Sequence, residues 1–324
     1  MKFISKDQNR RNFLKNTSLA SLGLLVNSNA MLSNTPLLNK IGIQLFSVPK
    51  MLTKDFDAAL NMLSGIGFRE IEMYGPYPFS TDLAKKYWNS VTPQLGFDGS
   101  GYFGHSQAEI INIMKSHGFN VPSMHTDIDT LQKNMGTLAD AANKIGAKYV
   151  VLPSIPEDHR KTLDDYKRTA DDFNKIGAEA LKNGIRFAYH NHGYGLKVTD
   201  GKMPLDIILD GTDPKLVFLE LDLYWTTAGG ASPIDLIKKH SGRYKMMHIK
   251  DMKQKVHFAG DGGEASQWIA LFPYMSNAGE GILDLPSIIK TAKENGMEHF
   301  FVEQDMVAEP AIALQKSFNF LKGL

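Results

Sequence analysis

The runs FAYHNH (187–192), VFLELD (217–222), KMMHIKD (245–251) and HFFVE (299–303) share one pattern. Each is a short, largely apolar stretch that ends in a histidine or an acidic residue. Such stretches are typical of strands that are buried on both faces of a parallel sheet. A helix-like segment follows each of them, which is the order of repeated β/α units. The four runs therefore predict parallel strands whose carboxyl ends bring polar side chains together.

The same pattern repeats in the first half of the chain, where further β-like runs lie at 41–46, 70–74, 121–125 and 149–152. Segments of helical period separate the strands, and several end at or near a glycine, a common helix stop signal. Eight β/α units in 324 residues match the order and size of a (β/α)8 TIM barrel. We therefore predict the α/β class, with a single barrel domain over residues 40–324. The expected helices cover residues 55–63, 131–145, 164–181, 233–240, 285–294 and 311–321.

The N-terminus carries an export signature. The run NRRNFLK (9–15) resembles a twin-arginine motif, and a mildly apolar run (17–26) and a small-residue cleavage site (28–30) follow in the order of a signal peptide. The apolar run is too short to span a bilayer, which takes roughly 20 residues, so a membrane anchor is disfavoured. We predict a twin-arginine signal over residues 1–30 and a linker over 31–39. The mature protein is then periplasmic, without stable membrane insertion.

The amino-acid composition limits which side chains could bind a metal ion and which classes of partner the protein could bind. The chain has no cysteine, so any transition-metal site must use histidines and carboxylates. Residues 1–30 hold five of the 36 basic and one of the 35 acidic residues, so the mature chain has 31 basic and 34 acidic residues and net charge −3. A slightly acidic protein without a basic stripe is a poor nucleic-acid binder. We expect a small-molecule sugar or polyol as partner, and the sequence leaves open whether the chain forms a homo-oligomer.

Four successive strand ends carry metal-ligating side chains, as pairs two residues apart. Because strand residues i and i+2 point the same way, one member of each pair is expected to face the mouth of the barrel. A lone histidine or acid there is usually a hydrogen-bonded structural group, but coincidence on four strands favours a shared ion. Two imidazoles and two carboxylates would neutralise a divalent ion, and such mixed ligands suit Mn, Co or Zn better than Mg. The pairs are His190/His192, Glu220/Asp222, His248/Lys250 and Glu303/Asp305.

Longer motifs point to a known family. The runs FAYHNHGYGL, LELDLYW, GRYKMMHIKDM, AGEGILD and HFFVEQD resemble the bacterial sugar phosphate isomerase/epimerase family of the xylose isomerase-like TIM barrel superfamily, which includes exported twin-arginine members. The resemblance covers the whole predicted barrel. It implies a divalent ion (Mn, Zn, Co or Mg) held by Asp222, His248 and Glu303 with one ligand from the fifth strand. Epimerases of the family have glutamate there, whereas this chain has His190, with His192 as the alternative ligand.

The resemblance also implies an isomerase or epimerase that acts on a carbohydrate or polyol through a metal-polarised carbonyl and proton transfer. Glu303, His192 and Lys250 are the predicted catalytic residues. The family's epimerases use glutamates of the fifth and eighth strands as an acid/base pair. Histidine on the fifth strand therefore makes a metal-dependent lyase or dehydratase, acting on a keto-sugar or inosose, a serious alternative. A catalytically inactive sugar-binding barrel is a third hypothesis.

Residues near the predicted rim are candidates for substrate binding. His125, Tyr224 and Trp225 are expected to line the site, and Lys250 to hold an oxyanion. Glu72, also counted among the substrate-site residues, is expected to orient the metal ligands from behind. Two of these residues have a structural alternative, which is a hydrogen bond for His125 and a salt bridge for Lys250.

Two long connections leave the same rim, at residues 75–104 and 252–281. Their aromatic side chains suit stacking on a sugar ring, and the alternative is that they pack the loops onto the barrel. These residues are Tyr77, Phe79, Tyr87, Trp88, Phe258 and Trp268.

Overall fold

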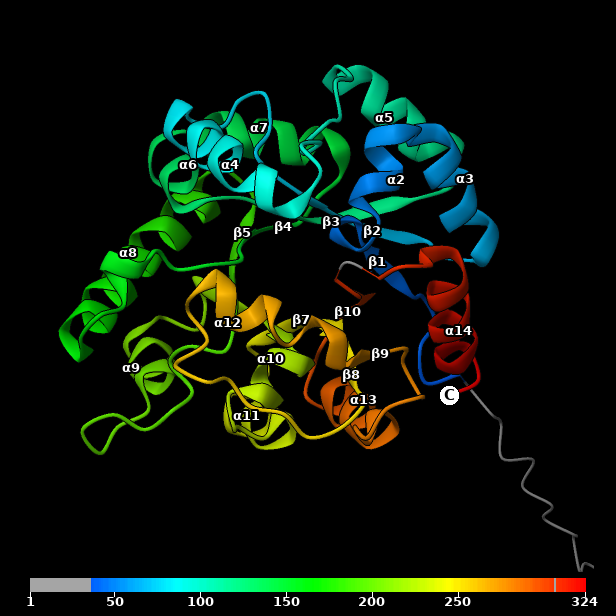
Figure 1. Cartoon of the computed structure of the whole chain (residues 1–324). Helices are drawn as coiled ribbons and strands as arrows, with labels where there is room; N and C mark the ends of the chain where they lie inside the picture. Colours follow the sequence, from blue (N-terminus) through cyan, green and yellow to red (C-terminus); the bar gives the residue numbers. More distant parts are fainter. Residues whose placement is uncertain (1–35, 306) are drawn as a thin grey trace, which may run out of the picture. The chain divides into compact units, whose positions relative to one another are not determined.

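The computed structural model describes residues 36–305 and 307–324 (Figure 1). The predicted signal over residues 1–30 lies outside this part of the chain, as does most of the predicted linker. Within the described part, no helix is long and apolar enough to cross a membrane.

Among the described residues, eight parallel strands close into a barrel, so the predicted (β/α)8 fold is confirmed. Around the barrel the strands follow the order β1-β10-β7-β6-β5-β4-β3-β2. A short antiparallel pair, β8 (Asp251–Met252) with β9 (Met275–Ser276), lies in the long connection after β7. The barrel strands are β1 (Gly42–Gln44), β2 (Glu70–Tyr74), β3 (Asn120–His125), β4 (Tyr149–Leu152), β5 (Arg186–His190), β6 (Val217–Asp222), β7 (Tyr244–Ile249) and β10 (His299–Val302).

Helices alternate with the strands and lie outside the barrel (Figure 1). Ser232 caps α11, because its side chain accepts a hydrogen bond from the backbone N–H of Asp235. Gly146 ends α7 in the left-handed conformation that favours glycine. The helices are α2 (Pro49–Lys54), α3 (Phe56–Ile66), α4 (Asp82–Leu95), α5 (Gln107–Ser116), α6 (Ile128–Lys133), α7 (Met135–Ile145), α8 (Leu163–Lys182), α9 (Pro204–Gly211), α10 (Leu223–Ala228), α11 (Pro233–Lys239), α12 (Ala265–Ile269), α13 (Leu285–Glu294) and α14 (Pro310–Lys322).

The structure differs from the predicted elements in several places. The helix predicted over 131–145 is two helices, α6 and α7, which meet at Asn134. The strand predicted over 187–192 ends at His190, so His192 lies in the following loop. The long connection after β2 contains α4, and α2, α9 and α10 are too short for a periodic pattern to reveal them.

An apolar layer fills the barrel below the carboxyl ends of its strands. Its buried members are Tyr149, Val151, Ala188, Met246 and Phe301, with Phe218 packed against them. A Cβ at Gly42 would lie 2.4 Å from Phe301 Cδ1, so only glycine lets this ring close the interior. Strand side chains face the same way every second residue, and the polar site starts two residues further along the same strands. In each case the polar residue lies two positions after the apolar residue: Ala188 and His190, Phe218 and Glu220, Met246 and His248, and Phe301 and Glu303.

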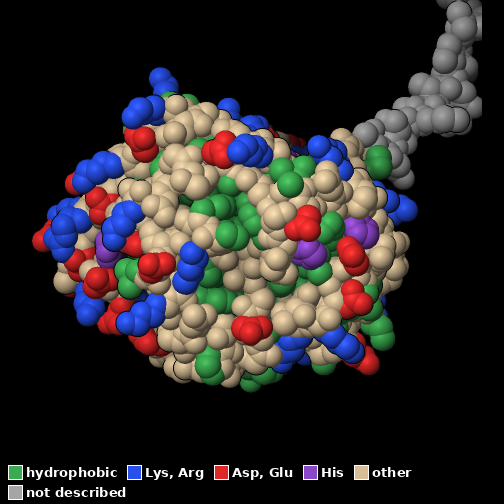
Figure 2. Space-filling view, turned by 90° about the horizontal axis from the view of Figure 1, so that it is seen from above, with side chains coloured by type: hydrophobic (Ala, Val, Ile, Leu, Met, Phe, Trp, Pro, Cys, Tyr) green, Lys and Arg blue, Asp and Glu red, His purple; other side chains and the backbone are tan. Residues whose placement is uncertain are grey.

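The surface carries charges of both signs. On the face drawn in Figure 2, Lys and Arg side chains are interspersed with Asp and Glu, and apolar side chains gather near the middle. Surface ion pairs on α8, such as Lys167–Asp164 and Lys175–Asp172, have the same mixed character. This face therefore differs from the continuous basic stripe that binds nucleic acid.

Candidate active site and metal centre

Ionisable side chains converge at the carboxyl ends of β6, β7 and β10. Asp222 ends β6, His248 lies in β7 and Glu303 directly follows β10. One ligand atom from each lies within 4.8 Å of the others, and all three residues are buried. His248 Nδ1 is 2.6 Å from Glu303 Oε2 and 3.9 Å from Asp222 Oδ2. Together with Lys250 and Asp305, we call this group the rim cluster.

Lys250 is the cation of the rim cluster. Its Nζ lies 2.6 Å from Glu303 Oε2, 2.9 Å from Asp305 Oδ2 and 3.0 Å from Asp222 Oδ2. Burial alone would lower the pKa of Lys250, but the three carboxylates raise it well above its ordinary value. The ammonium therefore stays charged, and the salt bridge considered for Lys250 is present.

The acids of the rim cluster differ in proton affinity. Burial raises the pKa of Asp305 to about 7, although Lys250 beside it opposes the shift. Burial also raises the pKa of Asp222. Burial would raise the pKa of Glu303 as well, but Lys250 and His248 outweigh it and lower that pKa. A proton bound to the carboxylates of the rim cluster therefore resides on Asp305 in preference to Glu303.

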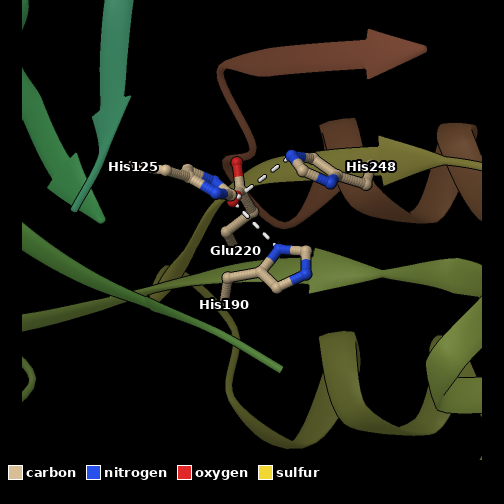
Figure 3. Close-up of side chains that lie close together, drawn as sticks. All are labelled: His125, His190, Glu220 and His248. Carbon is tan, nitrogen blue, oxygen red and sulfur yellow. Dashed lines mark hydrogen bonds and ion pairs between the residues drawn. The ribbon is translucent and has the colours of Figure 1, made fainter. Parts of the chain in front are cut away.

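A second group lies one layer deeper in the barrel, and we call it the inner cluster. It consists of Glu72, His125, His190, Glu220 and His248, all of them buried. Figure 3 shows three of its imidazoles around the carboxylate of Glu220. Glu220 Oε2 is 2.8 Å from His125 Nε2, 3.0 Å from His190 Nδ1 and 3.4 Å from His248 Nε2. His248 belongs to both clusters, because its Nδ1 faces the rim while its Nε2 faces the interior.

Glu72 contacts His248 from the interior side. Its Oε2 is 2.5 Å from His248 Nε2 and 3.1 Å from His125 Nε2. Gln44 Nε2 and Ser123 Oγ donate hydrogen bonds to this carboxylate, at 2.9 and 2.5 Å. Burial would raise the pKa of Glu72, but the two histidines lower it. A carboxylate on the far nitrogen orients a metal-ligating histidine, so the geometry fits the orienting role predicted for Glu72.

The imidazoles of the inner cluster differ in charge. Burial alone would lower the pKa of His125, but Glu72 and Glu220 raise it to about 9. Burial and the neighbouring His248 lower the pKa of His190 well below its ordinary value. His190 is therefore a neutral imidazole, which is the form that ligates metal ions.

The rim cluster fits a divalent metal ion. Imidazole nitrogen and carboxylate oxygen are ligands that Mn, Co and Zn take in proteins. Asp222 Oδ2 is buried and makes no hydrogen bond within the described part of the chain, although it forms an ion pair with Lys250. An ion held by Asp222, His248 Nδ1 and Glu303 would supply that missing partner. His190, the fourth predicted ligand, is not one of the three residues whose ligand atoms form this group, although its Nε2 lies 3.8 Å from Asp222 Oδ2.

His192, the alternative ligand and a predicted catalytic residue, is the more exposed of the two histidines. Its ring centroid lies 5.3 Å from that of His190 and 6.2 Å from that of Trp225. Surrounding protein atoms and the nearby Lys250 lower the pKa of His192 to about 3, so the ring is neutral at physiological pH. A neutral imidazole beside the rim cluster has a nitrogen free of its proton that can accept one from a bound molecule, and its lowered pKa makes it a weaker base than an ordinary histidine.

The predicted substrate-binding residues lie in three different surroundings. Trp225 is at the rim, where its ring stacks on Phe258 and lies 5.1 Å from Lys250 Nζ. Tyr224 is fully buried, and its hydroxyl donates to a backbone carbonyl at 2.6 Å. This is a packing position, and it gives no support to a substrate contact by Tyr224. His125 lies in the inner cluster, where it makes the structural hydrogen bond considered for it.

The connection after β7 is fixed to the neighbouring loops. The ring of Phe258 lies 5.6 Å from that of Trp225. A Cβ at Gly193 would lie 1.8 Å from Phe258 Cε2, so only glycine allows this approach. Arg160, after β4, pairs with Asp261 at 3.2 Å. These contacts place an aromatic wall beside the rim cluster.

Sequence reasoning gave no role to several residues that the structure brings into the two clusters. Glu220 and Asp305 lie two residues from Asp222 and Glu303, so strand period was an available signal for both. Gln44 and Ser123 carried no signal, because neutral polar residues at strand positions are common. The residues without a predicted role are Gln44, Ser123, Glu220 and Asp305.

Comparisons with known proteins agree with this architecture. The model of the family described as "Xylose isomerase-like TIM barrel" matches residues 61–324. A curated inosose dehydratase of Clostridium beijerinckii is 25% identical over 290 residues, which cover 82% of this chain and 89% of the relative. The match to an inosose dehydratase of Clostridium botulinum is 28% identical and spans about half the length of each protein, 46% of this chain and 51% of the relative.

Solved structures share the fold. A sugar phosphate isomerase/epimerase from Parabacteroides distasonis superposes with a TM-score of 0.68 at 22% identity, over 88% of this chain and 93% of that one. The IOLI protein, whose structure has a bound zinc atom, superposes with a TM-score of 0.60 at 16% identity, over 86% of this chain and 95% of that one. At these identities the likeness concerns the fold.

Proposed function

The chain belongs to the xylose isomerase-like TIM barrel family, and on that premise we propose that it is a metal-dependent lyase that dehydrates a cyclic keto-polyol of the inosose class. The observation that carries the proposal is the rim cluster, which joins three carboxylates, an imidazole and an ammonium at the carboxyl ends of adjacent strands. The similarity to inosose dehydratases over most of the chain supports the choice of reaction.

We assign the metal ion to Asp222, His248 and Glu303 in the rim cluster. When bound, a divalent ion there would polarise the carbonyl of the substrate and make the neighbouring C–H group more acidic. Glu72 would act behind it by holding His248 through Nε2. The donor set suits Mn, Co or Zn, and the identity of the metal stays open, with Mg the least favoured.

The remaining residues of the rim cluster are assigned to charge and proton transfer. Lys250 is placed to stabilise negative charge that develops on the carbonyl oxygen. His192, neutral and partly exposed, is assigned as the group that takes the proton from the carbon next to the carbonyl. The same imidazolium then returns the proton to the departing hydroxyl. The C–H and C–O bonds break, a C=C bond forms, and one water molecule leaves.

An isomerase or epimerase is the second candidate, because it begins with the same removal of a proton. Two groups that can transfer protons, His192 and Glu303, follow β5 and β10, which are separated in the barrel by β6 and β7. Removal of a proton on one face and its return on the other is what epimerisation at a single carbon requires. The two candidates differ only in whether a hydroxyl departs.

The reaction can be tested with the full chain loaded with Mn, Co or Zn and offered unphosphorylated inososes and cyclic keto-sugars. Dehydration predicts a product that is lighter by one water and absorbs as an enone. Deuterium uptake from D2O into interconverting sugars, without loss of water, would support the isomerase and overturn the lyase. Binding without turnover would support the inactive sugar-binding barrel instead.

The cellular location of the enzyme stays a prediction. The predicted twin-arginine signal over residues 1–30 lies outside the described residues, and we propose export to the periplasm on the sequence alone. An exported enzyme seldom meets phosphorylated sugars, which is why the test uses unphosphorylated substrates.

A further inference from the structure

The proposed reaction uses the inner cluster only through His248 and its partner Glu72, and it gives no role to His125, His190 or Glu220. The cluster consists of Glu72, His125, His190, Glu220 and His248, and none of these residues is more than 7% exposed. Five ionisable side chains buried together cost free energy unless charge and hydrogen bonds are satisfied. These five side chains therefore need partners that balance their charges and fill their hydrogen-bonding positions.

The geometry of the inner cluster is that of a ligand set. Nitrogen and oxygen atoms alternate around a ring, from His125 Nε2 to Glu72 Oε2 (3.1 Å), His248 Nε2 (2.5 Å), Glu220 Oε2 (3.4 Å) and back to His125 Nε2 (2.8 Å). The ligand atoms of His125, His190, His248 and Glu220 all lie within 4.8 Å of one another, close enough to share one ion. His190 Nδ1 adds a further donor, 3.0 Å from Glu220 Oε2.

Hydrogen bonds alone leave this arrangement incomplete. Each Nε2 can carry one hydrogen, yet His125 and His248 each face two carboxylate oxygens, so two of the four edges of the ring have no hydrogen. The other oxygen of Glu220, Oε1, is buried without any hydrogen-bond partner among the described residues. A buried carboxylate oxygen without a protein partner is a position where a cation would be stabilising.

We propose that the inner cluster binds a second divalent cation, with His125 Nε2, His190 Nδ1, His248 Nε2 and Glu220 as its ligands. Three imidazoles and one carboxylate are a tetrahedral set of the kind that zinc takes. Glu72, fixed by Gln44 and Ser123, supplies the second negative charge that balances the ion.

The shared residue links the two ions. His248 offers Nδ1 to the rim cluster and Nε2 to the inner cluster, so with both ions present its ring serves both as an imidazolate, and the inner ion takes over from Glu72 the task of fixing the ring through Nε2. Both ring protons of His248 are then released to solvent. The inner ion lies below the rim and is structural, and its presence does not depend on which reaction the rim cluster performs.

The test is the metal content of the purified full chain after zinc loading and removal of free zinc. Wild type is expected to hold about two equivalents, Glu220→Gln about one, Asp222→Asn about one, and His248→Ala close to none, because this residue serves both ions. Glu70→Gln is the matched control. Glu70 is a buried glutamate two residues before Glu72 on the same strand, and its ion pairs are with His299 at 2.9 Å and Lys40 at 3.7 Å rather than with either cluster, so this variant should keep two equivalents.

Zinc anomalous scattering from crystals of the loaded wild type gives the same answer without any variant. A peak between His125, His190 and Glu220 is expected, beside a peak at Asp222 and Glu303. A single equivalent that Glu220→Gln retains, or the lack of the inner peak, would overturn the second ion. A single equivalent that only Glu220→Gln removes would keep the inner site and instead overturn the metal assignment at the rim. Neither result requires turnover, so a failure of the proposed reaction is detected separately.

Discussion

The two ends of the barrel use the same residue types to different effect. At the amino ends of the strands, Glu70 pairs with His299 at 2.9 Å and with Lys40 at 3.7 Å, and the group stops there. At the carboxyl ends, glutamates and histidines of the same strands join two clusters that share His248. A buried Glu–His pair is therefore no sign of a site by itself. Convergence from several strands is what distinguishes the catalytic end.

The strongest test of this comparison is loss of a rim carboxylate. We expect Asp222→Asn to lower kcat/KM by more than the roughly 100-fold that loss of an outer-shell partner of a metal site costs. The reason is that the variant removes a proposed ligand and a partner of Lys250. Glu70→Gln should change kcat/KM by less than about two-fold, since Glu70 contacts neither cluster. Steady-state kinetics of both variants measures the two changes in kcat/KM. Equal losses of kcat/KM would contradict the proposed difference between the two ends of the barrel.

Loss of the rim ammonium should have the next largest effect. Lys250→Met removes the charge placed to stabilise an oxyanion, and we expect kcat to fall about 100-fold, as when one preorganised donor is lost. The metal content should stay unchanged, because Lys250 is not a proposed ligand. Kinetics and elemental analysis of the same preparation measure both. A variant that keeps full activity would show that the ammonium only neutralises its three carboxylates.

Metal removal should affect stability as well as activity. An ion present at 100 times its dissociation constant stabilises the fold by about 2.7 kcal/mol, so chelation is expected to lower Tm by about 5 °C. Calorimetry with and without chelator measures the difference. Glu70→Gln should lose as much on chelation as wild type, and Asp222→Asn less. An identical Tm before and after chelation of a chain shown to contain metal would contradict the prediction.

The smallest expected effect concerns acid stability near the amino ends. Burial would raise the pKa of Glu298, but Lys148, 2.6 Å away, and Lys245 lower it below its ordinary value of 4.5. A depressed carboxyl pKa stabilises the fold above the ordinary value, and this contribution is lost as pH falls through the folded-state pKa. Because Lys148 and Glu298 are partly exposed, Glu298→Gln should reduce the unfolding free energy at pH 7 by less than about 1 kcal/mol.

The pH dependence of that difference is the measurement. Denaturant unfolding of wild type and Glu298→Gln should give stabilities that differ at pH 7 and converge below pH 4.5, where Glu298 becomes protonated. Curves that stay parallel down to acid pH would assign the effect to packing rather than charge.

The fold could be predicted from the sequence because its signals are local. Short apolar runs, helical period and glycine stops specify each β/α unit, and eight units leave little choice of architecture. The errors have local causes too. The pattern continues across Asn134, where the chain begins a new helix, and the polar end of the fifth strand hides that it stops at His190.

The site could be predicted only in part, because depth within a barrel is not a local property. The residues at Asp222, His248 and Glu303 converge as their strand positions suggest. Strand register, which the sequence does not display, pairs His190 with Glu220, while its Nε2 lies 3.8 Å from Asp222 Oδ2, so its role as the fourth ligand stays a prediction. Aromatic residues of the long connections had two open roles, and Tyr77, stacked on Phe79 and 1% exposed, takes the packing one.

The phenyl ring of Phe301, packed against Gly42, closes the interior of the barrel below the two clusters. The clusters are then reached from one end of the barrel only. Substrate, product and ions must therefore approach both clusters from the carboxyl ends of the strands, the side on which Trp225 and Phe258 stack. The rate at which a bound ion exchanges with solvent would then depend on movement past these rings as well as on the strength of its ligands. Ions of the deeper layer would be the first to enter and the last to leave.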